Sequence, residues 1–352
     1  MKAKSFLKES LTKQKAYQVL PEPDLIKLNQ NELPYPWPKA MRQALAKHLS
    51  SLELNRYPLT EAINLQKALA KKLKLKPEQI LVATGSNMIL QVLVLALKHK
   101  TPVMGVRPSF ALYDLIPKTF AYPFVEVPLR QSDFSLDEEK FLKKVKEKKP
   151  GLIFLANPNA PTGGLYRQTF LKKLLKLAPG LVLLDEAYYE FSGVTWIKEL
   201  KKHPNLLISR TFSKAYGLGG VRLGYLVGEA SLMTEIKKAY VPFNVGVLSE
   251  QAGLFALKEE KFFKTKLKEI LTQREKLYQE MKKIKSLEVF PSQANFILFR
   301  LKNPQACFEF LKRKGLLIRN VSSQAGLAGC LRVSVGRPKE NQQFLNALNQ
   351  FA

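Results

Sequence analysis

The middle of the chain alternates short, mostly apolar runs with segments of helical pattern. Seven such runs are bounded by turn residues and cover 80–83, 103–106, 125–128, 153–156, 182–185, 206–210 and 224–227. Continuous apolar runs are typical of strands buried on both faces, and strands that alternate with helices form a mainly parallel sheet. We therefore predict an α/β fold whose large domain holds a mainly parallel seven-stranded sheet flanked by helices.

The pattern changes after residue 245. A long helix is expected over about 248–284, followed by short strands near Val289, Phe296 and Val333 that are interleaved with helices. We predict an amino-terminal arm and entry segment (1–35), a large domain (36–245) and a smaller α+β carboxyl-terminal domain that begins with the long helix (246–352). A chain of 352 residues, 46% of them hydrophobic, is long enough for one large and one small domain.

A lysine follows the predicted strand 206–210. Lys214 lies beside Thr211 and Ser213, and Arg222 follows in a glycine-rich segment. A lysine amine among hydroxyls and an arginine has the groups needed to form an imine with pyridoxal phosphate and to bind its phosphate. Because open α/β sheets bind ligands at the carboxyl ends of their strands, this position favours a functional role.

Two upstream strands also end in polar residues. Asp185 ends the strand 182–185, where its carboxylate can pair with a protonated pyridine nitrogen or, as strand-end acids often do, cap a helix or face water. Asn157 follows the strand 153–156 in a turn rich in Asn, Pro and Gly. Its amide, like the hydroxyl of Tyr188, can donate to the ring's phenolate oxygen.

A third segment suggests a phosphate site. Ser86 and Asn87 follow Gly85 at the start of a predicted helix, where free amides and the helix dipole attract an anion. The same residues are also ordinary helix caps. Further on, Tyr113 can stack on a pyridine ring, although a core position is the usual role of a single aromatic residue.

Together these segments resemble the fold-type I pyridoxal-phosphate enzymes, and most closely the histidinol-phosphate aminotransferase family. The resemblance spans nearly the whole chain and includes the entry segment 28–35, the run 56–58 and the run 331–336. It implies an aspartate-aminotransferase-like fold and a pyridoxal 5′-phosphate cofactor. The roles that it implies are Lys214 as Schiff-base lysine and proton shuttle, Asp185 on the pyridine nitrogen, Asn157 and Tyr188 on the phenolate, Tyr113 on the ring face, and Ser86, Asn87, Ser213 and Arg222 on the phosphate.

The resemblance also implies substrate contacts and an assembly. Arg332 would bind the carboxylate of glutamate, for which a guanidinium is suited because it makes two parallel charge-assisted bonds. Arg319 would bind the phosphate of histidinol phosphate, while Tyr17 and Asn31 of the arm and entry segment would line the substrate pocket. Tyr57 would reach the phosphate of the neighbouring subunit's cofactor, so the active unit would be a homodimer.

The predicted reaction converts L-histidinol phosphate and 2-oxoglutarate to imidazole acetol phosphate and L-glutamate, as in histidine biosynthesis. Three positions depart from the family pattern, namely Leu33, Thr84 and Met88. None of them removes a group that the cofactor chemistry needs, but they weaken the support for one particular substrate. An aromatic amino-acid aminotransferase and a threonine-phosphate decarboxylase therefore stay open as alternatives.

The charge of the chain supports one alternative of a different class. A net charge of +28, from 57 Lys and Arg against 29 Asp and Glu, is compatible with a basic nucleic-acid-binding protein. However, the lysines are spread over predicted helices such as 138–149 and 259–285 rather than gathered in one arm. Such runs are usually solvated helix faces, so we do not expect a nucleic-acid partner.

The remaining composition predicts a cytoplasmic protein, and the resemblance implies that its partners are small-molecule amino donors and keto acids. Cys307 and Cys330 form neither a disulfide framework nor a metal-ligand spacing, and the three histidines are dispersed. We therefore predict a reducing compartment and no metal. Residues 1–11 lack a signal-peptide core, and the longest apolar stretch, 89–97, is too short to span a bilayer, so no membrane partner is expected.

Overall fold

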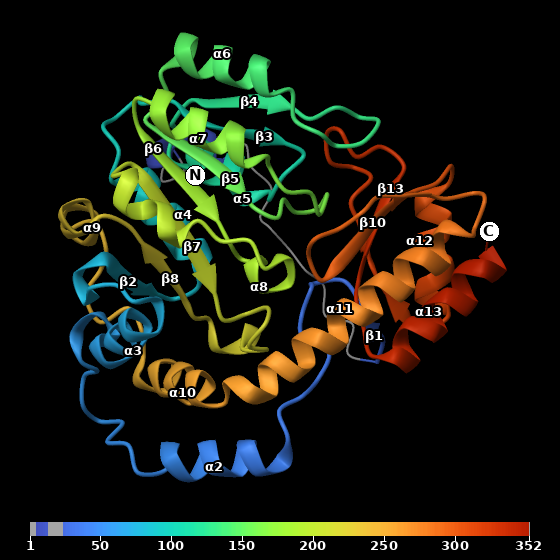
Figure 1. Cartoon of the computed structure of the whole chain (residues 1–352), viewed down its shortest axis with the longest axis horizontal. Coiled ribbons are helices and arrows are strands. Elements are labelled where there is room, and N and C mark those ends of the chain that lie inside the picture. Colours follow the sequence, from blue (N-terminus) through green and yellow to red (C-terminus); the bar gives the residue numbers. More distant parts are fainter. Residues whose placement is uncertain (1–4, 13–23, 352) are drawn as a thin grey trace.

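The computed structural model describes residues 5–12 and 24–351, and its centre is a seven-stranded sheet (Figure 1). The strands are β2 (Ile80–Ala83), β3 (Val103–Arg107), β4 (Phe124–Pro128), β5 (Leu152–Ala156), β6 (Leu181–Asp185), β7 (Leu206–Thr211) and β8 (Gly224–Val227). Their order is β2-β8-β7-β6-β5-β3-β4, and β8 alone runs in the direction opposite to the other six strands. The predicted α/β sheet is therefore confirmed.

Helices cover both faces of this sheet because the strands are apolar on both sides. On β5, Ile153 and Leu155 enter one core, whereas Leu152 and Phe154 enter the other. The first core is packed by α3 (Ile63–Leu73), α6 (Glu138–Lys148), α7 (Gln168–Leu177) and α10 (Val247–Lys258). The second is packed by α4 (Ser86–Leu95), α5 (Leu112–Thr119) and α9 (Ala230–Lys237). The other helices of this part are α1 (Glu9–Thr12), α2 (Lys39–Leu49), α8 (Tyr189–Ser192) and the 3₁₀ turns η2 (Thr60–Ala62), η3 (Pro77–Gln79), η4 (Ile197–Lys202) and η5 (Gly219–Val221).

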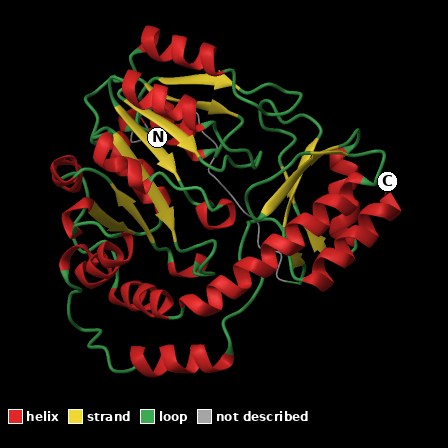
Figure 2. Ribbon diagram, in the orientation of Figure 1, coloured by secondary structure: helices red, strands yellow, loops and turns green. Residues whose placement is uncertain are grey.

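A smaller antiparallel sheet follows in the chain and lies to one side of the large sheet (Figure 2). Its strands, in the order β12-β13-β10-β9, are β9 (Glu288–Val289), β10 (Phe296–Arg300), β12 (Arg319–Asn320) and β13 (Cys330–Ser334). The helices α11 (Glu260–Lys282), α12 (Pro304–Arg313) and α13 (Pro338–Phe351) enclose its core. The arm joins this part through β1 (Ile26–Lys27), which pairs in parallel with β11 (Leu316–Leu317).

The single helix predicted over 248–284 is divided in the structure. Glu259 leaves the helical conformation (φ −88°, ψ 27°) and separates α10 from α11. On one side of the break, α10 buries Ala256 in the first core of the large domain, whereas the far end of α11 carries Met281 into the small-domain core. Both segments have a helical apolar pattern, so the sequence does not show where the helix axis changes between the two cores.

The helices and the two cysteines can be compared with the predictions on membrane association and redox compartment. Within residues 5–12 and 24–351, none of them combines the length and the apolar character that crossing a bilayer requires. Cys307 and Cys330 are both buried and unbridged. The cytoplasmic location stays a prediction.

Candidate active site

A cavity of about 450 Å³ opens at the carboxyl ends of the parallel strands, and its walls come from both sheets. It gathers eleven of the fourteen predicted site residues, which come from segments far apart in the chain. These are Asn31, Ser86, Asn87, Tyr113, Asp185, Tyr188, Ser213, Lys214, Arg222, Arg319 and Arg332. Their proximity follows from topology, because the ends of neighbouring parallel strands meet at one edge of the sheet.

Lys214 lies in the loop after β7, and its amine points across the cavity wall to the entry segment. The Nζ atom donates a hydrogen bond to the backbone carbonyl of Gln30 at 2.7 Å. It lies 5.9 Å from the centre of the Tyr188 ring. The amine is therefore placed beside the tyrosine expected to contact the same cofactor. Sequence reasoning missed Gln30 because it acts through its backbone, which no side chain reveals.

Asp185 ends β6 and is buried. Its Oδ2 accepts a hydrogen bond from the Tyr113 hydroxyl at 2.8 Å, and its Oδ1 accepts one from the Ala187 N–H at 3.1 Å. Burial raises the pKa of the Asp185 carboxyl. A cationic ring nitrogen next to this carboxylate would oppose that effect, so the position fits a pyridinium. The Tyr113 ring stacks on Phe154 at 5.1 Å, and its contact with a cofactor ring stays a prediction.

Asn157 follows β5 and is wholly buried beside Asp185, to whose carbonyl its N–H donates at 2.9 Å. Its Oδ1 accepts from the Tyr166 N–H at 3.1 Å, but its Nδ2 has no hydrogen-bond partner among the described residues. A buried donor without an acceptor is costly, and such groups in native proteins usually have a reason. An acceptor oxygen of a bound group, such as a phenolate, fits this donor.

The predicted phosphate site forms where α4 begins. Gly85 precedes this helix with φ +81°, and a Cβ atom there would lie 2.8 Å from Nη2 of Arg222. The positive φ favours glycine, and the absence of a Cβ atom leaves room for the guanidinium at the helix amino terminus. Arg222 is fixed by a bond from Nη1 to the carbonyl of Gly219 at 2.9 Å and reaches Oγ of Ser213 at 3.4 Å. Helix amides, a hydroxyl and a guanidinium together suit a phosphate dianion.

Two arginines face each other on the small-domain side of the cavity. Arg319 on β12 and Arg332 on β13 are direct cross-strand partners, and both line the cavity. Arg332 also donates to the carbonyl of Asn29 at 2.7 Å and lies 5.2 Å from the Phe296 ring. Like charges directly opposite each other on a sheet are destabilising. The pair is therefore suited to bind anionic groups that offset this repulsion.

Of the other three predicted site residues, Asn157 does not line the cavity but is buried next to the cavity residue Asp185. Tyr57 is 85% exposed and packs on Phe243, with ring centres 5.1 Å apart, so it does not line the cavity of its own chain. Tyr17 lies outside the described residues. Sequence reasoning did not single out Ser109 and Phe110, which line the cavity and follow the end of β3. The rule that sites lie at strand ends could have found them.

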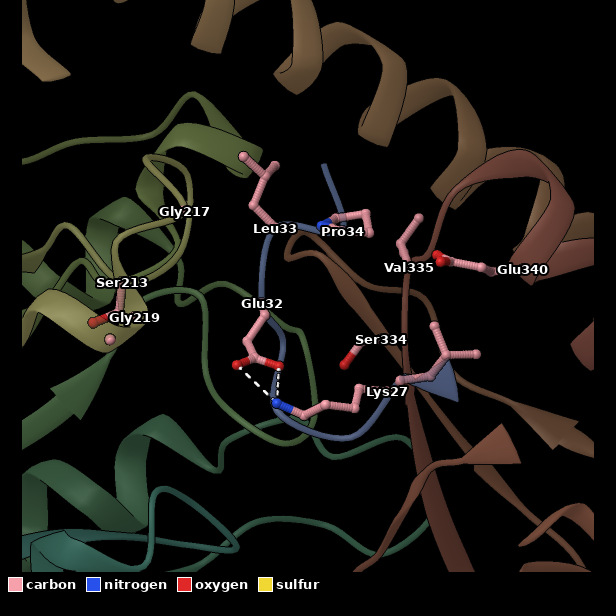
Figure 3. A pocket seen from close by; sticks show the side chains of 12 residues that line it. Lys27, Glu32, Leu33, Pro34, Ser213, Gly217, Gly219, Ser334, Val335 and Glu340 are labelled. Atoms are coloured by element: carbon pink, nitrogen blue, oxygen red, sulfur yellow. Dashed lines mark hydrogen bonds and ion pairs between the residues drawn. The ribbon is translucent and has the colours of Figure 1, made fainter. Parts of the chain in front are cut away.

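Figure 3 shows a second cavity, of about 280 Å³, which shares lining residues with the first. The entry segment runs between them, and Ser213, Gly219 and Glu32 line both. Lys27 and Glu32 form an ion pair of 3.0 Å at its wall. The far side is formed by Ser334, Val335 and Glu340 of the small domain. The entry segment thus contacts both domains at the active site.

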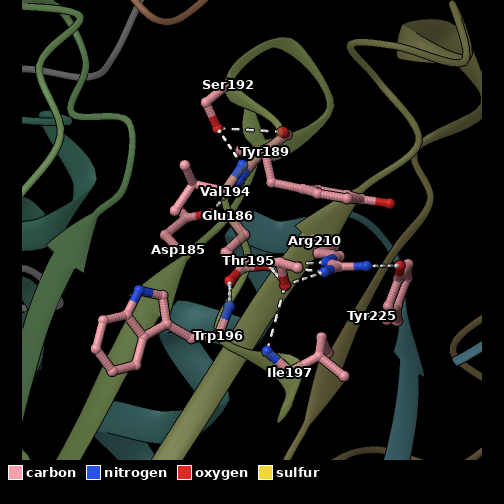
Figure 4. A network of polar contacts seen from close by, with 11 residues as sticks. Asp185, Glu186, Tyr189, Ser192, Val194, Thr195, Trp196, Ile197, Arg210 and Tyr225 are labelled. Atoms are coloured by element: carbon pink, nitrogen blue, oxygen red, sulfur yellow. Dashed lines mark hydrogen bonds and ion pairs between the residues drawn. The ribbon is translucent and has the colours of Figure 1, made fainter. Parts of the chain in front are cut away.

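A buried ionic network supports the strands behind the site (Figure 4). Arg210 of β7 contacts Glu186 through Nε at 3.0 Å and Nη2 at 2.8 Å, and its guanidinium lies 3.5 Å from the centre of the Tyr189 ring. Glu186 also accepts from the Trp196 N–H at 2.6 Å. Burial raises the pKa of Glu190 to about 8, so this nearby carboxyl is mostly protonated at neutral pH and Glu186 is the main counter-charge of Arg210.

This sheet, with a lysine after β7, an acid at the end of β6 and a guanidinium beside the amino terminus of α4, fits a pyridoxal-phosphate-dependent aminotransferase. The chain belongs to the aminotransferase class I and II family, whose model matches residues 23–348. It is 36% identical over 338 residues to the histidinol-phosphate aminotransferase of Aquifex aeolicus (strain VF5), with 95% of each chain covered. The predicted family resemblance and enzyme class are confirmed.

Solved structures agree with this assignment. The crystal structure of the histidinol-phosphate aminotransferase from Clostridium acetobutylicum has a TM-score of 0.84 at 26% identity, covering 92% of this chain and 98% of that one. The enzyme from Sinorhizobium meliloti, in complex with pyridoxal-5′-phosphate, has a TM-score of 0.83 at 25% identity, covering 92% and 89%. The predicted aspartate-aminotransferase-like fold is confirmed by these neighbours.

Proposed function

We propose that this aminotransferase holds pyridoxal phosphate through Lys214 and transfers the amino group of L-histidinol phosphate to 2-oxoglutarate. The observation that carries the substrate assignment is the facing pair Arg319 and Arg332 on the cavity wall. One guanidinium would bind the substrate phosphate and the other the carboxylate of glutamate or 2-oxoglutarate. The names of the relatives that are about one third identical support the same substrate.

Bound pyridoxal phosphate supplies an electron sink for the charge that develops at the substrate α-carbon. The chain's own residues would place it. Asp185 would pair with the ring nitrogen, Asn157 and Tyr188 would donate to the phenolate oxygen, and Ser86, Asn87, Ser213 and Arg222 would bind the phosphate. The Lys214 amine would move the proton between the substrate α-carbon and C4′ of the cofactor.

An absorption titration of the cofactor-loaded protein tests this proposal. L-histidinol phosphate and L-glutamate should each convert the band of lysine-bound cofactor to that of the aminated cofactor, whereas L-phenylalanine should require far higher concentrations. If only L-phenylalanine or another unphosphorylated amino acid reacts, the substrate assignment fails. If histidinol phosphate and glutamate leave the bound cofactor unchanged, the transamination proposal fails as well.

The two arginines should separate the two half-reactions. We expect Arg319→Gln to weaken the reaction with L-histidinol phosphate by about 10- to 100-fold, because one charged hydrogen-bonding partner is lost. The same variant should change the reaction with L-glutamate little. Arg332→Gln serves as the matched variant and should show the opposite selectivity. Rapid-mixing measurements of each half-reaction give kcat/KM, and equal losses on both substrates in both variants would contradict the assignment.

We also propose a homodimer in which Tyr57 completes the neighbouring site. Exposed apolar side chains lie on two segments of the chain that meet where Tyr57 packs on Phe243; they are Leu54, Tyr57, Leu59, Val241, Phe243 and Leu248. Exposed patches of this kind commonly mark an interface. Phe243→Glu should produce monomers in analytical ultracentrifugation, whereas Tyr57→Phe should stay dimeric but bind pyridoxal phosphate several-fold more weakly. A wild-type monomer at micromolar concentration would contradict the proposal.

A further inference from the structure

Asn31 has an unusual backbone conformation at the centre of the entry segment. It is buried and has φ +56°, in the left-handed region that non-glycine residues seldom occupy. Four hydrogen bonds hold it there. Its N–H donates to Oγ of Ser334 at 2.8 Å, its carbonyl accepts from Nδ2 of Asn295 at 2.9 Å, and its amide contacts Ser334 and Tyr188. A conformation fixed so completely is commonly connected with function.

The orientation of the Asn31 amide follows from Ser334. The Ser334 hydroxyl accepts from the Asn31 N–H, so its own proton is available for the Asn31 side chain, 3.0 Å away. A hydroxyl proton needs an acceptor, which places Oδ1 of Asn31 towards Ser334 and Nδ2 towards Tyr188. The hydrogen-bond network therefore favours this assignment of the two amide atoms, which gives the Ser334 proton an acceptor.

The orientation of the Asn31 amide decides where the proton of the Tyr188 hydroxyl points. An amide nitrogen can only donate, so the Tyr188 hydroxyl accepts the hydrogen bond from Asn31, at 2.9 Å. Its single proton is left for another acceptor, and the residue lines the active-site cavity. The Tyr188 ring is fixed edge-on against Phe296, with ring centres 5.2 Å apart, so the hydroxyl has little freedom to move.

We propose that Asn31 is a positioning residue that, held by Ser334, makes Tyr188 a hydrogen-bond donor to the cofactor phenolate. The proposal rests on the proposed function and goes beyond it, because it assigns a role to a residue that need not touch the reacting atoms. The neighbouring carbonyl of Gln30 holds the Lys214 amine at 2.7 Å. One strained turn thus positions two groups of the site and links them to β13 of the small domain.

The pKa of the nitrogen that joins Lys214 to the cofactor measures this effect. A hydrogen bond donated to the phenolate withdraws negative charge from it, which weakens its attraction for the proton on that nitrogen and lowers the pKa. Loss of the donor therefore raises the pKa, by about one unit for one hydrogen bond to a charged group. Absorption spectra recorded against pH give the value without any turnover.

The experiment is a double-mutant cycle on loaded protein, with wild type, Asn31→Asp, Tyr188→Phe and the double variant. Asp at 31 offers only acceptors, so it should turn the Tyr188 proton away from the cofactor. We expect Asn31→Asp to raise the pKa by at least about half a unit more in the tyrosine enzyme than in the phenylalanine enzyme. Its charge acts in both backgrounds, so the difference isolates the hydrogen bond. Equal rises would overturn the proposal.

Two further variants keep the test decisive if Asn31→Asp does not fold. Asn31→Gly tolerates the left-handed backbone and carries no charge; because it frees the Tyr188 proton without attracting it, it should raise the pKa less than Asn31→Asp does, and only when Tyr188 is present. Asn295→Ala removes a bond that holds the same backbone without orienting the amide, so it should lower thermal stability and leave the pKa unchanged. An equal rise in Asn295→Ala would show a merely structural role. A wild-type protein that gains no absorption band with pyridoxal phosphate would instead refute the proposed function.

Discussion

Replacement of Lys214 by alanine is expected to lower the rate of transamination by more than about 10³-fold. The variant loses the amine that would hold the cofactor and move the proton between the α-carbon and C4′. Lys214 lies at the cavity, and its amine contacts the carbonyl of Gln30 and the face of the Tyr188 ring rather than a core cluster, so its removal should leave the fold intact. Single-turnover reactions with L-glutamate give the rate, and thermal unfolding checks the fold.

Chemical labelling tests the same residue independently of the rate. Borohydride treatment of the loaded wild type should fix the cofactor on the peptide that contains Lys214, and the alanine variant should carry no label there. Lys201→Ala, at an exposed position in η4, is the matched lysine control and should retain both label and rate. A folded Lys214→Ala protein that reacts at the wild-type rate would refute the assignment.

The largest expected effect on stability comes from Arg210. We expect Arg210→Met to lower the free energy of unfolding by about 3–5 kcal/mol, because Glu186 would be left as a buried charge without its partner. The side chains of Arg210 and Glu186 are only 3% and 0% exposed. Urea unfolding, followed by circular dichroism, gives the free energy. Glu186→Gln should also lower the free energy of unfolding. The double variant should lower it by less than the sum of the two single effects.

An exposed ion pair of similar geometry provides the control. Arg167 contacts Glu138 through Nε and Nη2, each at 2.7 Å, but the Arg167 side chain is 76% exposed. Solvent and salt screen such a pair, so Arg167→Met should change stability little. If Arg210→Met and Arg167→Met lower the free energy of unfolding equally, burial does not explain the contribution of the Arg210 pair to stability. Because Arg210 lies four residues before Lys214, its loss should also make the loop that carries Lys214 more mobile.

Much of the site could be predicted from sequence because of where its residues lie along the strands. Asp185, Asn157 and Lys214 all follow apolar runs, and the ends of neighbouring parallel strands share one edge of the sheet. Eleven predicted residues line one cavity, and among them Asn31, Arg319 and Arg332 were predicted from the family resemblance and not from strand position. Tyr57 shows the limit of this reasoning, because its predicted contact lies on another copy of the chain.

The sequence by itself determined the alternation of strands and helices and the chemical groups at the strand ends, since both depend on local pattern and residue type. Only the tertiary structure decided that the Gln30 carbonyl, 184 positions away, receives Lys214, and that Arg319 faces Arg332. Only the fold placed Ser334 where it orients Asn31, and only the fold divided the helix at Glu259. These features depend on backbone groups, strand register and packing between two cores, which distant segments create only when they come together.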